Sequence, residues 1–487
     1  MSKILFVSSE AHPLIKTGGL GDVGGSLPAA LKRLRHTVRL VLPAYQQAVA
    51  RAGKLKTIAT LRVTRGGAPA QILEGQMPDT RVKVWLVDVP GCFDRPGNPY
   101  LGEDGRDWPD NAERFATFCR VVVELAMDRA GLGWRPDVVH CNDWQTGLVP
   151  ALLAREDKRP ATVFTIHNLA YQGLFPWDKF AALGLPADLW HMHAMEFHNQ
   201  FSFIKGGLVF ADWITTVSPT YAREICGPEL GYGLDGLLRH RNDRLTGILN
   251  GADYDIWNPA EDQLIPHCYS AATLHHKCAN KAALQEQFML PVDGKKPLVG
   301  FVGRMVEQKG IDLVLGTLPA LVKKGVQVAV LGAGETVFEK ELCALANRHP
   351  QSIGYHIGYD EARAHLVEAG ADMFLMPSRF EPCGLNQIYS LRYGTPPIVR
   401  RTGGLADTVV DATPEALADG SATGFLFDEV SPAAVLTALE RALALYRKPK
   451  DWKRLMVTGM AQDFSWEASA RAYLEIYARA RSHARAA

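Results

Sequence analysis

Two short segments combine fixed cations with glycines, a combination that suits the binding of phosphate groups. Lys16 precedes the run TGGLGDVGG at residues 17–25, which leads into the helical pattern SLPAALKRL. Arg304 and Lys309 lie in RMVEQKG, directly after the apolar run PLVGFVG at 297–303. Glycines let a ligand approach the backbone, a helix N-terminus offers free N–H groups, and Arg and Lys neutralise phosphate charge. Both segments therefore predict contacts with an anionic ligand.

Further polar groups follow other apolar runs. Glu381 lies in MPSRFEPCGLNQ and the pair Gly403-Gly404 in RRTGGLADTV, while Asp143 and His167 end the runs HCND and TIH. The carboxyl ends of parallel strands meet at one edge of a sheet, so these groups are expected to gather into sites. Three glycine-bearing loops together with Arg and Lys exceed what one carboxylate ligand needs, and they suit a diphosphate.

Other interpretations of the same residues are less well supported. The glycines at 19, 21 and 24 match G-x-G-x-x-G, but a long connection separates them from the apolar run at 3–9. The run at 37–43 also lacks the terminal acidic residue that would bind a nicotinamide ribose. Neither a P-loop motif nor a set of His, Asp and Glu with metal-ligand spacing is present, so we expect no metal and no cofactor. An ordinary surface turn with solvated cations remains the alternative for each loop.

Composition limits the possible partners and the compartment. Lys and Arg number 53 against 52 Asp and Glu, a net charge of +1, so no nucleic-acid or membrane partner is expected. The eight cysteines form no C-x-x-C pair, which is typical of reduced thiols rather than of a disulfide framework or zinc site. The start, MSKILFVSSE, reads as a strand and not as a signal peptide. We therefore expect a cytoplasmic protein.

The 487 residues suggest two large domains, and short β-branched runs alternate with helical patterns in both halves. The runs are 3–9, 37–43, 137–143, 161–168, 213–218 and 245–251, then 297–303, 326–332, 352–358, 372–378, 396–400 and 424–428. Residues 55–90 predict an antiparallel insertion and the polar stretch 250–263 a linker. The expected fold is α/β, with two doubly wound domains facing an interdomain cleft. The helical pattern at 465–487 could pack on either domain.

Seven motifs together resemble the family of bacterial glycogen synthases and plant starch synthases. They are KTGGLGDV, HCNDWQTGL, TIHNLAYQG, LNGAD, GRMVEQKG, SRFEPCGLNQ and RRTGGLADTV, in the order found in that family. The resemblance implies a GT-B fold, with residues 1–250 and the returning helix 465–487 forming a Rossmann-like acceptor-side domain. Residues 251–464 would form the domain that binds the nucleotide sugar. The implied reaction moves glucose from ADP-glucose to the non-reducing end of an α-1,4-glucan, such as glycogen, with retention of configuration and release of ADP.

The resemblance also implies roles for individual residues. Arg304 and Lys309 would neutralise the departing diphosphate, His167 would contact the transferred glucose, and Glu381 would lie close to that sugar. The remaining expected substrate-binding residues are Lys16, Gly18, Gly19, Glu10, Asp22, Asp143, Asn250, Gln308, Tyr359, Cys383, Gly384, Leu385, Gly404 and Thr408. Two positions depart from related patterns: Tyr389 replaces the second glutamate of E-x7-E, and Asn142 stands where many members have histidine.

Retention allows two chemical routes. In a double displacement Glu381 would act as nucleophile; in a front-face attack the departing phosphate takes the acceptor's proton, and Glu381 stabilises charge and positions glucose. The resemblance favours the front-face route. The alternatives to this function are a transferase for UDP-glucose or a small acceptor, a non-catalytic glucan-binding protein, and a phosphorylase. A phosphorylase would need a pyridoxal-bearing lysine, for which the sequence shows no motif.

Overall fold

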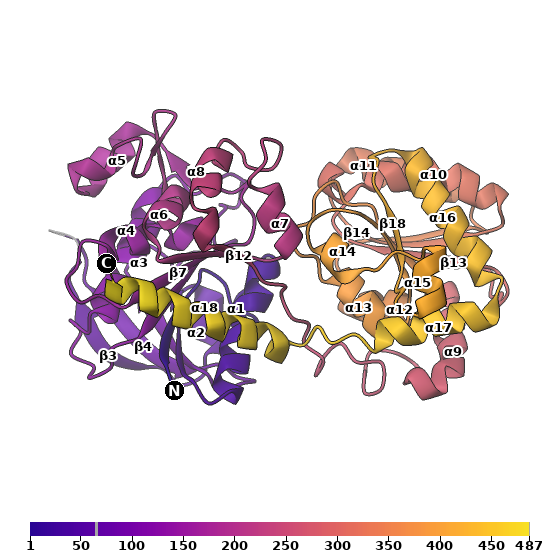
Figure 1. Ribbon diagram of the computed structural model, residues 1–487, viewed down its shortest axis with the longest axis horizontal. Helices are drawn as coiled ribbons and strands as arrows, with labels where there is room; N and C mark the ends of the chain where they lie inside the picture. Colours follow the sequence, from indigo (N-terminus) through magenta and orange to yellow (C-terminus); the bar gives the residue numbers. More distant parts are fainter. Residues whose placement is uncertain (64–66, 487) are drawn as a thin grey trace. The chain divides into compact units, whose positions relative to one another are not determined.

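The computed structural model describes residues 1–63 and 67–486, and the chain divides into two α/β units (Figure 1). The first unit contains Met1–Gly251 together with the chain from Trp466 onward, and the second contains Ala252–Ser465. The boundaries expected at 250 and 464 each lie one residue before this division. None of the described helices combines the length and apolar character needed to cross a membrane.

A nine-stranded sheet forms the centre of the first unit, in the order β12-β11-β7-β6-β1-β2-β5-β4-β3. Its strands are β1 (Lys3–Val7), β2 (Thr37–Pro43), β3 (Lys56–Leu61), β4 (Ala70–Gln76), β5 (Lys83–Asp88), β6 (Val138–Asn142), β7 (Ala161–Ile166), β11 (Trp213–Thr216) and β12 (Leu245–Gly247). The strands from β12 to β5 run parallel, and β4 and β3 add an antiparallel edge.

The segment 55–90 was expected to be an insertion, but it extends the main sheet. Strand β5 pairs in parallel with β2. It pairs antiparallel with β4, which in turn pairs antiparallel with β3. The side chains of Val84, Trp85 and Leu86 are fully buried, as in a strand covered on both faces. Alternation alone could not reveal this, because the partner strand β2 is distant in sequence.

Helices cover both faces of the first sheet. They are α1 (Gly19–Arg33), α2 (Gln46–Arg51), α3 (Asn111–Ala126), α4 (Leu148–Leu153), α5 (Trp177–Leu183), α6 (Phe203–Phe210), α7 (Pro219–Glu224), α8 (Asp235–His240) and α18 (Trp466–Ala486). A three-stranded antiparallel sheet lies beside them, formed by β8 (Leu174–Phe175), β10 (Gln200–Ser202) and β9 (Glu196–Phe197).

The C-terminal helix α18, yellow in Figure 1, packs against α1 and against strands β7 and β11 of the first unit. Its side chains Tyr473 and Tyr477 are buried. The Tyr477 hydroxyl lies 2.8 Å from Nδ1 of His140, whose Nε2 lies 2.6 Å from the Thr165 hydroxyl. This buried chain of polar contacts ties the end of the polypeptide to β6 and β7, which settles the placement that the helical pattern left open.

The second unit has a six-stranded, fully parallel sheet in the order β15-β14-β13-β16-β17-β18. Its strands are β13 (Leu298–Val302), β14 (Gln327–Gly332), β15 (Ile353–Ile357), β16 (Met373–Met376), β17 (Pro397–Arg400) and β18 (Phe425–Phe427). Its helices are α9 (Lys277–Gln287), α10 (Ile311–Lys323), α11 (Thr336–Arg348), α12 (Glu361–Gly370), α13 (Asn386–Arg392), α14 (Gly403–Thr408), α15 (Pro414–Asp419), α16 (Pro432–Tyr446) and α17 (Pro449–Met460). Every strand here was predicted from its apolar run.

The predicted linker, 250–263, begins where the two units divide and is anchored in the second unit by an aromatic stack. The Trp257 ring lies between two others, with centroid distances of 3.7 Å to His365 and 4.0 Å to Tyr389. Further along the segment, Asp262 accepts hydrogen bonds from the Tyr393 hydroxyl at 2.5 Å and from His365 at 2.8 Å. Tyr389, which replaces the second glutamate of E-x7-E, thus has a packing role here.

Candidate active site

The loop after β1 is organised by the carboxylate of Glu10, which is 3% exposed. It accepts hydrogen bonds from the backbone N–H groups of Thr17 and Gly18, from the Thr17 hydroxyl at 2.6 Å, and from the Tyr100 hydroxyl at 2.6 Å. The long connection between β1 and the glycines is therefore folded around this buried acid. Glu10 shapes the glycine loop, and its expected contact with substrate stays a prediction.

The N-terminus of α1, which follows that loop, has free space beside its first residues. A Cβ built on Gly18 or Gly19 would meet no described atom within 4 Å. The ammonium of Lys16 lies 2.7 Å from the Asp22 carboxylate, at the surface beside this N-terminus. The first turn of a helix carries free N–H groups and a partial positive charge, so an anion placed here would meet both the amides and Lys16.

His167 and Asp143 come together at the neighbouring ends of β6 and β7. The backbone N–H of His167 donates to the Asp143 carboxylate at 2.7 Å, and Nε2 of His167 lies 2.9 Å from the side-chain oxygen of Asn142. Asp143 has a φ of +56°, a backbone conformation that residues with a Cβ rarely adopt and that clusters at functional sites. This conformation places the Asp143 carboxylate within hydrogen-bond distance of the His167 backbone N–H.

Burial shifts both titrating groups of this corner toward their neutral forms. Desolvation lowers the pKa of His167 to about 3, so its imidazole is neutral near pH 7. Desolvation raises the pKa of Asp143 to about 7, although the backbone N–H groups of His167 and Asn168 oppose the shift. A neutral imidazole can accept or donate a hydrogen bond without adding charge to a bound sugar.

Asn250 is an additional polar group, one residue before the first unit passes into the second. Its side chain is 7% exposed, and within the described part of the chain its oxygen Oδ1 has no hydrogen-bond partner although it is buried. An unpaired buried carbonyl is costly, and a ligand donor would satisfy it. This supports its expected contact with substrate, which stays a prediction.

In the second unit, the ends of β13 and β16 bring Lys309 and Glu381 together. The ammonium of Lys309 lies 2.5 Å from Oε2 of Glu381, and the Ser378 hydroxyl donates to the same oxygen at 3.0 Å. Glu381 is buried, whereas the Lys309 side chain retains 21% exposure. Gln308 donates to the main-chain oxygen of Phe380 at 3.4 Å and joins the two loops. A cation and a carboxylate are thereby held side by side at one sheet edge.

The glycine pair after β17 is required by close backbone packing. Gly403 has a φ of +44°, and a Cβ there would lie 1.9 Å from the Glu381 main-chain oxygen. A Cβ on Gly404 would lie 2.0 Å from the main-chain oxygen of Cys383. The Gly404 N–H donates to the main-chain oxygen of Glu381 at 3.1 Å. The protein itself thus uses this amide to hold the acidic loop, and its expected contact with a diphosphate stays a prediction.

Hydrogen bonds made by neighbouring side chains stabilise the segment between Glu381 and α13. Gly384 has a φ of +73°, and the buried Thr408 hydroxyl donates to the Gly404 carbonyl at 2.6 Å. The Gln387 amide donates to the Cys383 carbonyl at 2.9 Å, while its oxygen is buried without a partner among the described residues. Cys383 is buried, and Leu385 lies half-buried just before α13. These contacts fix the loop that carries Glu381.

Arg304 and Tyr359 are the least constrained of the expected site residues. Arg304 is exposed, and within the described ranges its guanidinium reaches only the side-chain oxygen of Gln308, at 3.4 Å. The Tyr359 side chain is 84% exposed, and its hydroxyl donates to the neighbouring Glu361. Both side chains lie in loops that follow strands of the second sheet, where movement toward a ligand costs few existing contacts.

Sequence reasoning missed the residues that support the site through long-range hydrogen bonds. Tyr100 comes from a loop without a motif, and the contacts of its hydroxyl with Glu10 and Ser9 reveal its place. Ser378 and Gln387 stand inside quoted motifs, but nothing in their spacing indicated that they contact Glu381 and the Cys383 loop. Their positions inside a motif could have pointed to Ser378 and Gln387, whereas no sequence signal pointed to Tyr100.

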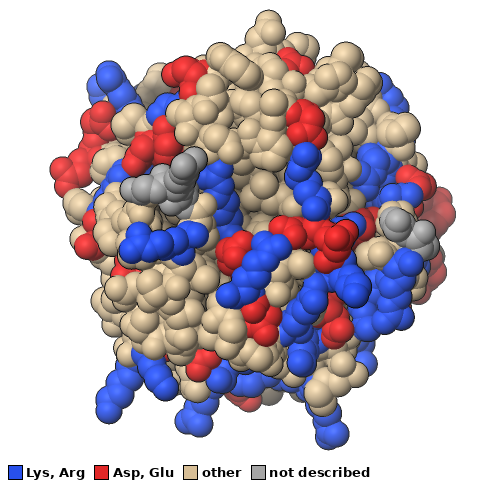
Figure 2. All heavy atoms as spheres, turned by 90° about the vertical axis from the view of Figure 1, so that its left-hand side faces the viewer, with Lys and Arg blue, Asp and Glu red and all other residues tan. Residues whose placement is uncertain are grey.

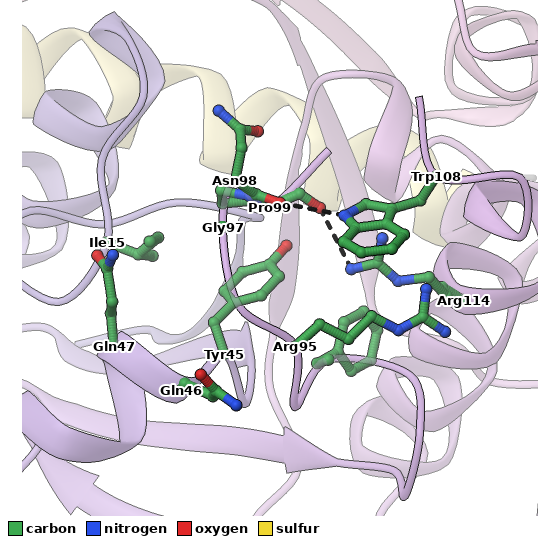
Figure 3. A pocket seen from close by; sticks show the side chains of 11 residues that line it. Ile15, Tyr45, Gln46, Gln47, Arg95, Gly97, Asn98, Pro99, Trp108 and Arg114 are labelled. Atoms are coloured by element: carbon green, nitrogen blue, oxygen red, sulfur yellow. Dashed lines mark hydrogen bonds between the residues drawn. The ribbon is translucent and has the colours of Figure 1, made fainter. Parts of the chain in front are cut away.

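A small cavity of about 60 Å³ lies elsewhere in the first unit (Figure 3). Tyr45, Asn98, Trp108 and Arg114 line it, and Arg114 donates to the Pro99 carbonyl at 3.2 Å. The residues lining it do not include any expected site residue. Figure 2 shows basic and acidic side chains interspersed over the face in view, so the charge of that face does not indicate a site.

Comparison with known families matches both units. Residues 3–240 match the starch synthase catalytic domain, and residues 284–455 match glycosyl transferases group 1. The glycogen synthase 2 of Nitrosococcus oceani is 59% identical over 98% of this chain and 97% of its own length. The glycogen synthase of Thioalkalivibrio sulfidiphilus is 59% identical over 98% of this chain and 99% of its own length.

Solved structures agree with this assignment. The catalytic domain of starch synthase IV from Arabidopsis thaliana, bound to ADP and acarbose, superposes with a TM-score of 0.88 at 32% identity, covering 99% of both chains. Sucrose-phosphate synthase from Thermosynechococcus elongatus has a TM-score of 0.60 at 16% identity, with 98% of each chain covered, and shares the fold.

Two parallel-sheet units of this type, with cations and a carboxylate at strand ends, define a glycosyltransferase of the GT-B fold. Within that class, the chain belongs to the glycogen synthase family, as its near full-length identity with glycogen synthases shows.

Proposed function

We propose that this protein transfers glucose from ADP-glucose to the non-reducing end of an α-1,4-glucan, with retention of anomeric configuration and release of ADP. The observation that carries the proposal is the pairing of Lys309 with Glu381 at 2.5 Å, beside the exposed Arg304. The structural relative bound to ADP and acarbose supports an adenine nucleotide and a glucan as ligands. The proposed site assignments follow from this chemistry.

Lys309 and Arg304 act on the leaving group. When the glucose–diphosphate bond breaks, negative charge grows on the phosphate, and a fixed cation is worth more in the transition state than in the ground state. Lys309 provides a compact charge already held in place by Glu381, while Arg304 is available to bind the phosphate oxygens with two N–H groups. In the first unit, the open N-terminus of α1 with Lys16 offers amide donors and a cation to an anionic ligand.

Glu381 stabilises positive charge near the anomeric carbon and positions glucose. Its carboxylate already accepts hydrogen bonds from Lys309 and Ser378, which makes it a poorer nucleophile than a carboxylate without such partners. The front-face route therefore fits better: the acceptor hydroxyl attacks the face that the phosphate leaves, and the phosphate oxygen takes its proton. His167 contacts the sugar as a neutral group.

Donor and product analysis tests the proposal. The purified protein is incubated with glycogen and labelled ADP-glucose or UDP-glucose, and the polymer is then digested with enzymes specific for α- or β-linkages. We expect label from ADP-glucose in polymer that only the α-specific enzyme releases. A preference for UDP-glucose would change the donor assignment, and a β-linked product would contradict retention. Glycogen binding without transfer from either donor would favour a non-catalytic glucan-binding protein. The cytoplasmic location expected from the sequence stays a prediction.

A further inference from the structure

The side chain of Asn142 holds the imidazole of His167 in one orientation, and its own orientation is set by the backbone. Asn142 is fully buried at the end of β6. Its amide nitrogen Nδ2 donates to the Val7 carbonyl at 2.9 Å, and its oxygen Oδ1 lies 2.9 Å from Nε2 of His167. Strands β1 and β6 are paired at this point, with Val7 opposite Cys141, so the Val7 carbonyl is a fixed feature of the sheet.

These contacts determine which atom of the amide faces the histidine. A main-chain carbonyl only accepts hydrogen bonds, so the group facing Val7 must be the NH₂ of Asn142. The opposite amide orientation would bring two oxygens together at Val7 and is disfavoured. Oδ1 therefore faces His167, and because an amide oxygen only accepts, the proton of the neutral imidazole must reside on Nε2.

The other ring nitrogen of His167 is then an acceptor. Nδ1 has no hydrogen-bond partner among the residues that the structure describes, and its lone pair is available to a ligand. The groups around the ring are Asn142, the Asp143 carboxylate at the His167 backbone, and the imidazole of His140. Asn142 cannot gain or lose a proton, whereas a histidine at this position could present either ring nitrogen.

We propose that Asn142 is a positioning residue that fixes the Nε2–H tautomer of His167, so that Nδ1 accepts a hydrogen bond from a hydroxyl of the transferred glucose. The ligand part of this inference rests on the proposed function, whereas the tautomer follows from contacts within the first unit. A neutral acceptor adds no positive charge near an anomeric carbon that itself becomes positive during transfer. Asn142 thus keeps His167 in the form that the reaction needs.

Nitrogen NMR of histidine-labelled protein tests the tautomer without any substrate. His167 is assigned by the signal lost in His167→Ala, and we expect a protonated Nε2 and an unprotonated Nδ1 throughout pH 5.5 to 8. Asn142→Leu removes the acceptor and should populate the Nδ1–H tautomer. Asn142→Asp places a carboxylate beside the ring and should make His167 titrate at a higher pH. Asn168→Ala, whose side chain accepts from the Ala170 N–H rather than from the ring, is the matched control.

Kinetics test the contact with the sugar. ADP-glucose analogues that lack one hydroxyl each are compared in the wild type, His167→Ala and Asn142→Leu. We expect one analogue to react about tenfold more slowly than ADP-glucose in the wild type, and this discrimination to shrink in both variants, mainly through kcat. Asn142→Asp should lose activity toward acidic pH as His167 becomes charged.

Protonated Nδ1 in the wild type, or an unchanged His167 spectrum in Asn142→Leu, would overturn the tautomer assignment. Equal discrimination among the analogues in wild type and Asn142→Leu would overturn the sugar contact. If the wild type transfers glucose from neither nucleotide sugar but shows the expected tautomer, the proposed function fails while the positioning role of Asn142 stands.

Discussion

The ammonium of Lys309 lies 2.5 Å from a carboxylate oxygen of Glu381, and the two residues come from loops that follow the paired strands β13 and β16. They are 72 positions apart in sequence, so only the parallel pairing of these strands brings them together. Each group keeps its partner ordered before a ligand arrives. A preorganised pair of this kind costs little rearrangement when charge develops in the transition state.

Because the Glu381 carboxylate already accepts hydrogen bonds, we predict that it forms no covalent intermediate with the sugar. Incubation with an ADP-glucose analogue whose 2-hydroxyl is replaced by fluorine should leave the intact mass of the protein unchanged, because Lys309 and Ser378 both donate to Oε2 of Glu381 and lower the nucleophilicity of the carboxylate. Glu381→Gln should lower kcat by about 10²–10³, on the scale of one preorganised electrostatic group. A glucosyl adduct located on Glu381 by peptide mass spectrometry would instead establish a double displacement.

The substitution Arg304→Ala should lower activity and leave stability almost unchanged. The side chain is exposed and, among the residues that the structure describes, makes a single weak hydrogen bond, to Gln308 at 3.4 Å, so its removal should change the free energy of unfolding by less than about 0.5 kcal/mol. We expect kcat to fall by about 10²–10³ because the diphosphate loses a cation. Denaturant unfolding and initial rates are measured on the same preparation. Near-normal turnover would remove Arg304 from the proposed mechanism.

The stack of Trp257 between His365 and Tyr389 should stabilise the second unit. Trp257→Leu removes two ring contacts at 3.7 and 4.0 Å and should lower the free energy of unfolding by about 2–3 kcal/mol. Trp257→Phe, which keeps an aromatic ring in place, should cost less. The unfolding transition of the second unit is followed by urea titration. Equal stability of Trp257→Leu and the wild type would show that the stack is incidental.

Acid should destabilise the first unit through His140. Burial lowers the pKa of His140 from 6.5 to about 3, so the folded state binds fewer protons than the unfolded state between these values. The stability contributed by the neutral ring is present above pH 6.5 and falls by up to about 1.4 kcal/mol per pH unit as the pH decreases toward 3. The lowered pKa of His167 makes stability fall with decreasing pH in the same way. The raised pKa of Asp143, about 7, makes stability rise with decreasing pH and largely offsets the contribution of His167.

The variant His140→Gln isolates this contribution. Its free energy of unfolding should vary less with pH than that of the wild type between pH 5 and 6.5, although its stability at pH 7 is lower because the bonds to Tyr477 and Thr165 are altered. Parallel pH profiles for the two proteins would show that His140 is not the group responsible.

Much of the fold could be predicted because each buried parallel strand is a short apolar run with glycine or polar residues after it. The runs at 297–303 and 372–378 correspond to β13 and β16. After β17, the glycine pair is required by close backbone contacts, as at Gly403. The position of α18 could not be derived from periodicity. It depends on packing against α1, β7 and β11 and on buried contacts such as that from Tyr477 to His140, which an amphipathic pattern does not encode.

The candidate site, like the fold, was predictable from the sequence only in part. Lys309 and Glu381 stand in recognisable loops, so sequence could name them, but their contact depends on strand order. Glu10 was expected near substrate, and the structure places its carboxylate beneath the glycine loop with Thr17 and Tyr100. Asn142 was noted only as a departure from a pattern. The hydrogen bonds of its side chain with Val7 and His167 give it a positioning role that residue type alone could not indicate.

The incorporation of labelled glucose from ADP-glucose into glycogen, measured side by side for the wild type and Lys309→Ala, tests the central claim most directly. We predict rapid incorporation by the wild type and a rate lower by about 10²–10³ in the variant, because the leaving diphosphate loses a fixed cation. Lys309→Arg should retain more activity than Lys309→Ala, and circular dichroism checks that the variants are folded. Equal incorporation by the wild type and a folded Lys309→Ala variant would contradict this account of the site.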